Sequence, residues 1–446
     1  LNNFVPYPEF QDKDFNMKIF KKKEFYINRI PKIILDTQKS SFQKQINDLS
    51  NKTCKKWQLN HNQTFLKNYL GPNTPYNGIL LFHGTGVGKT CSSITIAEQY
   101  KHELASQDKK IYIILNPSIK QNFVKNIFDI EKVKLGKVDN QCTGRTYLDE
   151  VGNQDNLDKL YEKVLKKINS RYTFLGYVGF ANMIEKIESK ASSLSRNPSI
   201  VKQKIDSKIK ELFSNSVLII DEAHNIKNTN TLSKTSKMKV LPPILERVVK
   251  TAENLKLILL TATPMFDNAQ EIVWLLNLLL MNDKRPVVKT NQLFDRVGNL
   301  TPDGEKMLIA KSRGYISFMR GENIIKFPKR IYPDLIKHPN VLKPTQFPKK
   351  YIDGTTIPEH LRLNKLKIIN CPMVGFQKQI YSRMENKTDV DKGESSFGAF
   401  DLAGIMTSNI TYMGDIESYT GSNPKSKFDK MFKRTKTSGN VKFTPK

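Results

Sequence analysis

A short apolar run followed by a glycine-rich loop constrains the fold of this chain more than any other stretch. Ile79–Phe82 is wholly apolar, which predicts a buried parallel strand. Strand, glycine loop and helix in this order are the context of a phosphate-binding loop, in which backbone N–H groups turn toward phosphate oxygens at the positive end of the helix dipole. The sequence therefore predicts an α/β fold with a nucleotide site after this strand. The loop and the start of its helix are Gly84, Thr85, Gly86, Val87, Gly88, Lys89 and Thr90.

Two side chains at the start of the helix carry the predicted chemistry. Lys89 is expected to reach the β- and γ-phosphates, and the Thr90 hydroxyl is expected to bind Mg²⁺. The strict phosphate-loop pattern has glycine at position 83, where this chain has His83. A chance glycine-rich turn is the alternative, but it does not explain why an apolar strand and a helix flank the loop.

A second apolar strand ends in a pair of acids. Val217–Ile220 is followed directly by Asp221, Glu222, Ala223 and His224. Because the carboxyl ends of parallel strands meet at one edge of a sheet, these acids are expected beside the phosphate loop. Asp221 can hold the Mg²⁺ shell, and Glu222 can accept a proton from the attacking water as general base. His224 is expected to couple this site to the next motif rather than to do chemistry.

A pair of threonines follows the next apolar strand. Leu257–Leu260 ends at Thr261, and Thr263 comes after one alanine. Two hydroxyls at this edge of the sheet are expected to relay between the Mg²⁺ site and the side that meets nucleic acid.

Two further segments are predicted to contact ligands. Gln63 lies ahead of the phosphate loop, and its amide is predicted to face the adenine edge. The strand Lys110–Leu115 is followed by Asn116, Pro117 and Ser118, a position that suits contact with a nucleic acid backbone. A surface glutamine and a plain turn between strand and helix are the respective alternatives.

The charge balance of the chain favours a polyanionic partner. Lys and Arg number 72 against 43 Asp and Glu, which gives a net charge of +29 over 446 residues. Nucleic acid is the first candidate, because cationic side chains release the counterions condensed on its phosphates. A solvated basic surface without a partner is the alternative.

Cysteine usage and hydropathy exclude other classes of protein. The four cysteines show no C-x-x-C spacing, which predicts a reducing compartment with neither a zinc site nor a disulfide framework. The most apolar helical stretch, Ile272–Met281, has about half the length needed to span a bilayer, and no signal peptide is recognised. No membrane partner is therefore expected. The chain starts at Leu1, so it is expected to be a fragment.

The motifs together resemble a known family. Gly84–Thr90, Asp221–His224 and Thr261–Thr263 resemble motifs I, II and III of superfamily 2 helicases. With Thr74–Gly78 and Gly314–Gly321, they look like the D-E-A-H ATPases of nucleocytoplasmic large DNA viruses, typified by poxvirus nucleoside triphosphatase I and the small subunit of the early transcription factor. The residues from Thr261 onward are also similar to Swi/Snf-type translocases.

The resemblance implies an activity and partners. It implies a helicase or translocase that binds ATP and Mg²⁺ and hydrolyses ATP on DNA during viral transcription, together with viral RNA polymerase or transcription factor subunits. Such a protein is expected in the host cytoplasm, at the viral factory, or in the virion. A non-catalytic DNA-binding subunit of a transcription initiation complex and an RNA helicase are the alternatives.

Three regions are expected along the chain. Residues 1–54 form an N-terminal extension, 55–285 a RecA-like lobe with a mainly parallel sheet, and 286–446 an irregular inter-lobe region whose basic end, 421–446, suits a DNA contact or a disordered linker. No motif VI of the type Q-x-x-G-R-x-x-R follows residue 286, so a second RecA-like lobe with its arginine finger is expected to be absent from this chain. Hydrolysis by the chain alone is then expected to be slow, because losing that finger costs roughly 10³–10⁵ in rate.

Overall fold

The chain divides into two compact units, Leu1–Pro328 and Lys329–Lys446. The residues that the computed structural model describes are 6–29, 42–54, 57–152, 156–226, 236–265, 268–319, 339–351, 354–359, 362, 368–390, 432–437 and 440–445.

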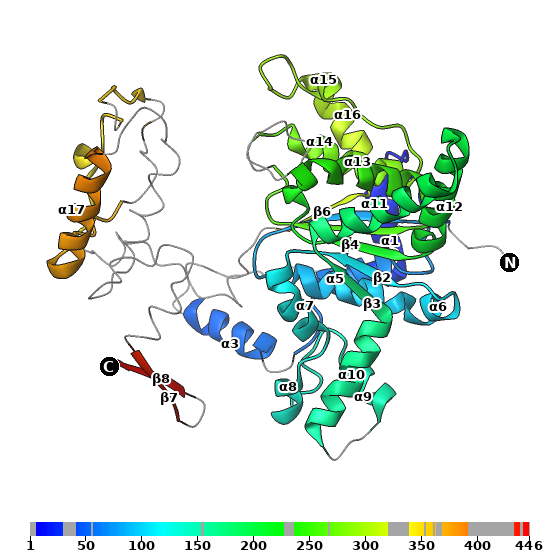
Figure 1. Cartoon of the computed structure of the whole chain (residues 1–446), viewed down its shortest axis with the longest axis horizontal. Coiled ribbons are helices and arrows are strands. Elements are labelled where there is room, and N and C mark those ends of the chain that lie inside the picture. Colours follow the sequence, from blue (N-terminus) through cyan, green and yellow to red (C-terminus); the bar gives the residue numbers. More distant parts are fainter. Residues whose placement is uncertain are drawn as a thin grey trace. The chain divides into compact units, whose positions relative to one another are not determined.

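The first unit is built on a six-stranded sheet in which every pairing is parallel. Its strand order is β3-β2-β4-β5-β1-β6, so the carboxyl ends of all strands lie along one edge (Figure 1). This confirms the predicted α/β class with a parallel sheet. The strands are β1 (Gly78–His83), β2 (Ile111–Ile114), β3 (Tyr172–Leu175), β4 (Val217–Ile220), β5 (Lys256–Thr261) and β6 (Ile316–Met319).

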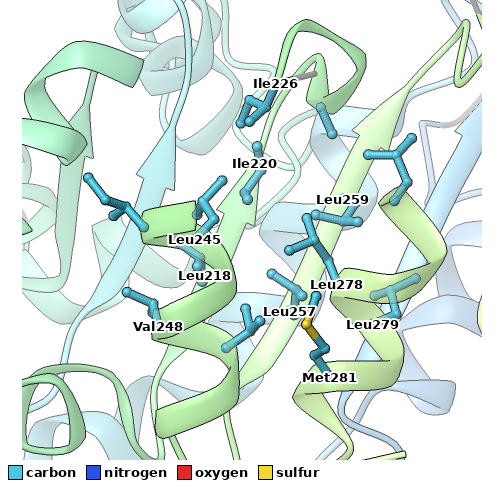
Figure 2. Packing of buried hydrophobic residues seen from close by; sticks show 14 of the residues in the cluster. Leu218, Ile220, Ile226, Leu245, Val248, Leu257, Leu259, Leu278, Leu279 and Met281 are labelled. Atoms are coloured by element: carbon cyan, nitrogen blue, oxygen red, sulfur yellow. The ribbon is translucent and has the colours of Figure 1, made fainter. Parts of the chain in front are cut away.

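Helices cover both faces of the sheet, which explains why its central strands are unbroken apolar runs. Along β4, Leu218 and Ile220 enter one core cluster while Val217 and Ile219 enter the other. Figure 2 shows the first cluster, where leucines of β5 meet α13 and α14. The helices of that face are α11 (Tyr177–Leu194), α12 (Pro198–Phe213), α13 (Ser236–Thr251) and α14 (Glu271–Asn282).

The opposite face carries the helix of the phosphate loop. Helix α5 (Lys89–Ala97) buries Ile94 and Ile96 against the second cluster. The other elements of this layer are α1 (Phe15–Lys21), α2 (Lys23–Tyr26), α4 (His61–Tyr69), η1 (Glu98–Tyr100), α6 (Lys101–Ser106), α7 (Lys120–Ile127), α9 (Thr146–Val151) and α10 (Leu157–Arg171). The remaining elements of this unit are α3 (Phe42–Cys54), η2 (Pro117–Ile119), α8 (Ile130–Lys134), η3 (Ala223–Asn225), α15 (Thr290–Leu293) and α16 (Pro302–Ser312).

The N-terminal extension is anchored to the lobe by aromatic side chains. The ring of Phe10 stacks on that of Tyr315 with 4.4 Å between centroids, and Phe15 is 2% exposed. The Tyr76 hydroxyl donates to the Pro8 carbonyl oxygen at 2.8 Å. Within the described residues, 6–29 therefore share the core of the lobe instead of forming a separate layer.

The lobe also extends beyond residue 285, where the sequence predicts it to end. Strand β6 pairs with β1 from Leu80↔Ile316 to His83↔Met319, and the first unit runs to Pro328. The region after 285 is thus not irregular throughout. Its strand is short and half-exposed, so it lacks the apolar run that marks the central strands.

The second unit holds a few separate elements. These are η4 (Pro344–Gln346), α17 (Gly375–Val390) and an antiparallel hairpin of β7 (Phe432–Thr437) and β8 (Asn440–Pro445). Within the basic end, 421–446, the hairpin accounts for the described residues 432–437 and 440–445, and a DNA contact there stays a prediction. Among the described residues of this unit, the hairpin is the only sheet, and a second parallel sheet is not found.

Two cysteines form a disulfide that the sequence, from which no disulfide framework was expected, did not indicate. Cys91, in the first turn of α5, is bonded to Cys142, and their Cα atoms lie 5.3 Å apart. The partners are separated by 51 residues, so no short-range spacing marks the pair. The fold brings them together by placing the loop before α9 against α5.

None of the described helices combines the length and the apolar character needed to cross a membrane.

Candidate nucleotide and nucleic-acid site

The phosphate loop has the backbone conformation that its glycines allow. Gly86 and Gly88 have φ of 75° and 88°, in the left-handed region that favours glycine. Gly88 forms the N-cap of α5, so the loop leads directly to the N–H groups at the positive end of a helix. A Cβ atom at Gly88 would lie 2.5 Å from Gln63 Nε2, the end of a flexible side chain, so the positive φ is the stronger reason for glycine at this position.

The Lys89 side chain lies within this loop. Its Nζ donates to the carbonyl oxygens of His83 and Gly84 at 3.0 and 3.2 Å. Burial lowers the pKa of Lys89, and the negative charges of Glu222 and Asp221 oppose that shift. The charges of both acids after β4 thus act on the Lys89 ammonium, and their joint role at a nucleotide stays a prediction.

The two acids sit at the end of β4. Asp221 is 8% exposed, its backbone N–H donates to Ile114 O at 2.9 Å, and its Oδ1 accepts from the Glu222 N–H at 3.0 Å. Burial, followed by the charge of Glu222, raises the pKa of Asp221 to about 6, although Lys89 acts in the opposite direction. A buried carboxylate with little solvation is well suited to neutralisation by a cation.

Glu222 occupies a strained backbone position. Its φ of 47° and ψ of 51° are left-handed, which is uncommon outside glycine. Such strain is held by surrounding structure and concentrates at functional sites. Its side chain is 40% exposed and its Oε2 lies 3.3 Å from His224 Nδ1.

Motifs II and III are joined by a polar relay. His224 Nδ1 and Thr261 Oγ1 form a hydrogen bond of 2.8 Å, and Thr261 Oγ1 also accepts from the Thr263 N–H at 3.0 Å. Thr261 is fully buried at the end of β5, between β4 and β1. The structure thus brings together Glu222, His224, Thr261 and the Thr263 backbone. The Thr263 hydroxyl takes no part in these bonds, and the coupling role of the three residues stays a prediction.

Gln63 is placed beside the phosphate loop, but its amide already has partners. Oε1 accepts from the Asn60 N–H at 2.8 Å in a capping box at the start of α4, and Nε2 donates to Gly88 O at 3.3 Å. The side chain is 6% exposed. Its contact with adenine stays a prediction, whereas its support of the loop is a feature that sequence reasoning missed.

His83 replaces the first glycine of the strict phosphate-loop pattern and has a structural partner. Its Nε2 lies 2.9 Å from Ser317 Oγ on β6. Burial and the charge of Lys89 lower the pKa of His83 to about 4, so the ring is neutral at physiological pH. The Gly84 N–H donates to Met319 O at 3.0 Å, which ties the start of the loop to the end of the edge strand.

The predicted nucleic-acid loop lies exposed at the end of β2. Asn116 Oδ1 accepts from the N–H and the hydroxyl of Ser118, and Pro117 opens the short helix η2. Asn116, Pro117 and Ser118 are all solvent-exposed, and their contact with nucleic acid stays a prediction.

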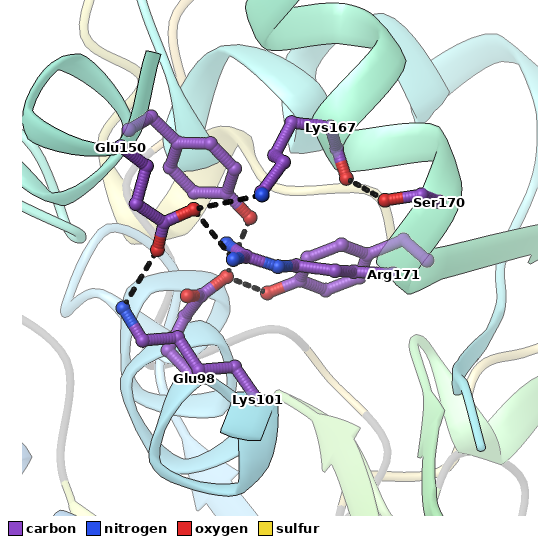
Figure 3. A network of polar contacts seen from close by, with 8 residues as sticks. Glu98, Lys101, Glu150, Lys167, Ser170 and Arg171 are labelled. Atoms are coloured by element: carbon purple, nitrogen blue, oxygen red, sulfur yellow. Dashed lines mark hydrogen bonds and ion pairs between the residues drawn. The ribbon is translucent and has the colours of Figure 1, made fainter. Parts of the chain in front are cut away.

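The far end of α5 is fixed by a buried polar network (Figure 3). Glu98 Oε1 accepts from the hydroxyls of Tyr147 and Tyr172 at 2.8 and 2.5 Å. Arg171 and Lys101 converge on Glu150 at 2.5 and 3.0 Å. Since these residues come from η1, α9, β3, α10 and α6, the network holds the helix whose other end forms the nucleotide site.

The residues present fit ATP and Mg²⁺. Left-handed glycines at a helix N-terminus form a cradle for phosphate, and a lysine with two nearby acids follows it. Thr90 and Asp221 have the hydroxyl and carboxylate oxygens that Mg²⁺ prefers alongside phosphate and water.

Comparison with known proteins agrees with these motifs. Residues 51–300 match the family model of the SNF2-related domain. A protein of Acanthamoeba polyphaga mimivirus, named as an ATP-dependent RNA helicase, is 30% identical over 93% of this chain and 34% of its own length. An early transcription factor large subunit homologue of African swine fever virus is 22% identical over 73% of this chain and 31% of its own length.

The chain therefore spans about a third of the length of these curated relatives. The motifs resemble the small subunit of the early transcription factor, whereas the African swine fever virus relative is named as a homologue of the large subunit. One similar solved structure is the Sulfolobus solfataricus SWI2/SNF2 ATPase core in complex with dsDNA. The alignment covers 75% of this chain and 53% of the Sulfolobus chain, with 16% identity and a TM-score of 0.34. The match of the family model over more than half of the residues shows that the chain belongs to the SNF2-related domain family, among the helicase-type ATPases of large DNA viruses.

Proposed function

We propose that this chain supplies the ATP-binding lobe of a nucleic-acid-dependent ATPase that moves on DNA during viral transcription. The observation that carries the proposal is the chain of contacts from Glu222 through His224 to Thr261. It runs from the predicted hydrolytic site into the strand beside the phosphate loop. A lobe that only bound nucleotide would not need a general base connected in this way.

Each residue has a defined role in the proposal. Lys89 and the N–H groups of α5 bind phosphate oxygens, and Thr90 with Asp221 holds Mg²⁺. Glu222 orients the attacking water and accepts its proton. ATP, when bound, supplies the phosphoryl group whose transfer releases free energy for movement. Asp221 stays ionised near neutral pH because its raised pKa is still only about 6.

DNA is the proposed track, and a transcription complex the proposed setting. The net charge of +29 supports a polyanionic partner. The exposed loop of Asn116, Pro117 and Ser118 supports a contact at the same edge of the sheet as the nucleotide. The transcription-factor names of some relatives support viral RNA polymerase or transcription factor subunits as partners. The host cytoplasm, at the viral factory, or the virion is the proposed location.

Two alternatives have specific support. The names of the mimivirus relatives favour RNA as the nucleic acid. The names of the African swine fever virus relatives favour a transcription-complex subunit. In this alternative, nucleotide sets only the conformation. For the second alternative, Glu222→Gln would leave transcription unaffected, whereas a motor would lose it while keeping DNA binding.

Stimulation of ATP hydrolysis tests the proposal. The chain is incubated with Mg·ATP alone and with duplex DNA, single-stranded DNA or RNA. We expect slow turnover by the chain alone, because an arginine finger from a second lobe is worth roughly 10³–10⁵ in rate. We expect this turnover to rise most with duplex DNA, the proposed track. Stimulation by RNA alone would favour the RNA helicase. The absence of hydrolysis above that of Glu222→Gln, with every polymer, would contradict an ATPase.

A further inference from the structure

Tyr177 is a residue that neither the motifs nor the proposed function assigns. It follows Gly176 at the start of α11, where the chain leaves the carboxyl end of β3. Its hydroxyl donates to the Asp221 carbonyl oxygen at 2.7 Å and lies 3.5 Å from the Glu222 carbonyl oxygen. β3 and β4 are not neighbours, since β2 lies between them. The side chain thus spans the end of one strand to reach the acids of motif II.

The same residue lies beside the predicted nucleic-acid loop. A Cβ atom at Gly176 would be 3.2 Å from Pro117 Cγ, so the absence of a side chain there lets the two loops pack closely. The Leu115 N–H donates to Leu175 O at 3.0 Å, and the Asp221 N–H donates to Ile114 O at 2.9 Å. The loop after β2 is therefore packed directly against the start of α11, which carries Tyr177.

The hydroxyl is positioned to act as a donor. The partner of the hydroxyl at 2.7 Å is a backbone carbonyl oxygen, which can only accept a hydrogen bond. Its acceptor belongs to the peptide group that leads into Glu222, whose backbone is left-handed. A hydrogen bond to this carbonyl fixes the orientation of that peptide, and hence of the predicted general base.

We propose that Tyr177 is a positioning residue that couples the nucleic-acid edge of the lobe to the orientation of Glu222. Nucleic acid bound at residues 116–118 and the start of α11 holds Tyr177 against the Asp221–Glu222 peptide. The general base then keeps the geometry needed for hydrolysis. The inference rests on the proposed function, which it deepens by naming the contact through which nucleic acid would stimulate hydrolysis.

Tyr177→Phe tests the inference because it removes the hydroxyl and keeps the ring. Steady-state hydrolysis is measured with and without the nucleic acid that binds most tightly. We expect the stimulated kcat to fall about tenfold. The KM for ATP and the affinity for nucleic acid should each stay within about twofold, because the hydroxyl that is removed bonds to a backbone carbonyl of this chain. An unchanged stimulated kcat would overturn the inference.

Tyr100→Phe is the matched control. The Tyr100 hydroxyl also donates to a backbone carbonyl, that of Leu70 at 2.6 Å; Tyr100 is buried, whereas Tyr177 is partly buried. Both variants lose one tyrosine–carbonyl bond, so a general loss of stability would affect them alike. We expect the control to retain stimulation. An equal fall in the stimulated kcat of both variants would reduce Tyr177 to a structural role and overturn the inference.

A binding experiment separates this inference from the proposed function. The affinity for a fluorescein-labelled DNA duplex, and for a labelled single-stranded RNA, is measured with and without Mg²⁺ and adenylyl imidodiphosphate, which is not hydrolysed. We expect the analogue to change the affinity of the native chain but not that of Tyr177→Phe. The same effect in both proteins, or none in the native chain, would overturn the coupling. If the analogue changed the affinity of the native chain but not that of Tyr177→Phe, and the native chain hydrolysed no ATP, the coupling would stand although the proposed function had failed.

Discussion

His224 Nδ1 lies 2.8 Å from Thr261 Oγ1 and 3.3 Å from Glu222 Oε2, so a single imidazole connects the predicted general base to the adjacent strand. Because Thr261 is fully buried and also accepts the Thr263 N–H, its hydroxyl has no freedom to exchange partners with solvent. The relay is therefore a fixed part of the lobe.

Thr261→Val should uncouple this relay. The substitution keeps the shape of the side chain but removes the hydroxyl that His224 Nδ1 and the Thr263 N–H contact, so hydrolysis should fall about tenfold or more at an unchanged KM. Steady-state kinetics with saturating nucleic acid measure the effect. The control is Thr74→Val, because Thr74 is also buried and donates to Tyr69 O at 2.7 Å, far from the motifs in sequence. Equal activity in both variants would refute the relay.

Gly88→Ala should abolish nucleotide binding and destabilise the lobe. The new Cβ would meet a φ of 88° and would lie 2.5 Å from Gln63 Nε2. Gly136→Ala is a matched control, because Gly136 has a φ of 66° but nothing within 4 Å of a Cβ. In the control, the free energy of unfolding should fall only by the cost of placing an alanine in the left-handed conformation, about 1 kcal/mol. Thermal unfolding and nucleotide titration compare the two, and identical losses would show that the contact with Gln63 is unimportant.

His83 should make the lobe sensitive to mild acid. Its pKa falls from the ordinary histidine value of 6.5, which the unfolded chain retains, to about 4 in the folded chain, so between these values the unfolded chain binds more protons. Its contribution to stability is complete above pH 6.5 and is lost as the pH falls toward 4, by at most about 3 kcal/mol. Urea unfolding should show that the free energy of unfolding falls less for His83→Gln than for the native chain between pH 6.5 and 4. The exposed His102→Gln should behave as the native chain does. If the free energy of unfolding fell equally with pH in His83→Gln and in the native chain, the burial of a neutral imidazole would be contradicted.

Reduction should weaken the lobe around α5. The bond between Cys91 and Cys142 closes a long loop, and disulfides of this kind stabilise by about 2–4 kcal/mol. Unfolding of the native chain should shift to lower urea on addition of a thiol reductant. Cys142→Ser should unfold at that lower midpoint with or without reductant. A native chain that is insensitive to reductant would show that the bond does not form in solution.

The sequence predicted the central strands because helices cover both sides of them. Val217–Ile220 and Leu257–Leu260 are unbroken apolar runs, and each appears in the structure as a strand that ends at a predicted motif. The order of the motifs then placed Asp221 and Thr261 at the edge that also holds Lys89. These inferences required only local patterns and the rule for the carboxyl ends of parallel strands.

Other features depend on contacts between distant residues. Strand β6 is short and half-exposed, so only its pairing with β1 identifies it. The partner of Cys91 and the acceptor of the Tyr177 hydroxyl lie far away in sequence, and neither spacing is typical of a motif. Gln63 was recognised from its position ahead of the loop, but its capping role follows from Asn60. The pattern Asn60-x-x-Gln63 at a helix start was the local signal for that role.

Binding of Mg·ATP tests the central claim most directly, namely that Lys89 and the acids after β4 belong to one nucleotide site. Isothermal titration is performed on the native chain, Lys89→Ala, Glu222→Gln and, as a control, Lys110→Ala, whose lysine is remote from the loop and donates to Ser170 O at 3.0 Å. The account predicts that Lys89→Ala loses binding, that Glu222→Gln binds without hydrolysing, and that Lys110→Ala equals the native chain. Native affinity in Lys89→Ala, or undiminished hydrolysis by Glu222→Gln, would contradict it.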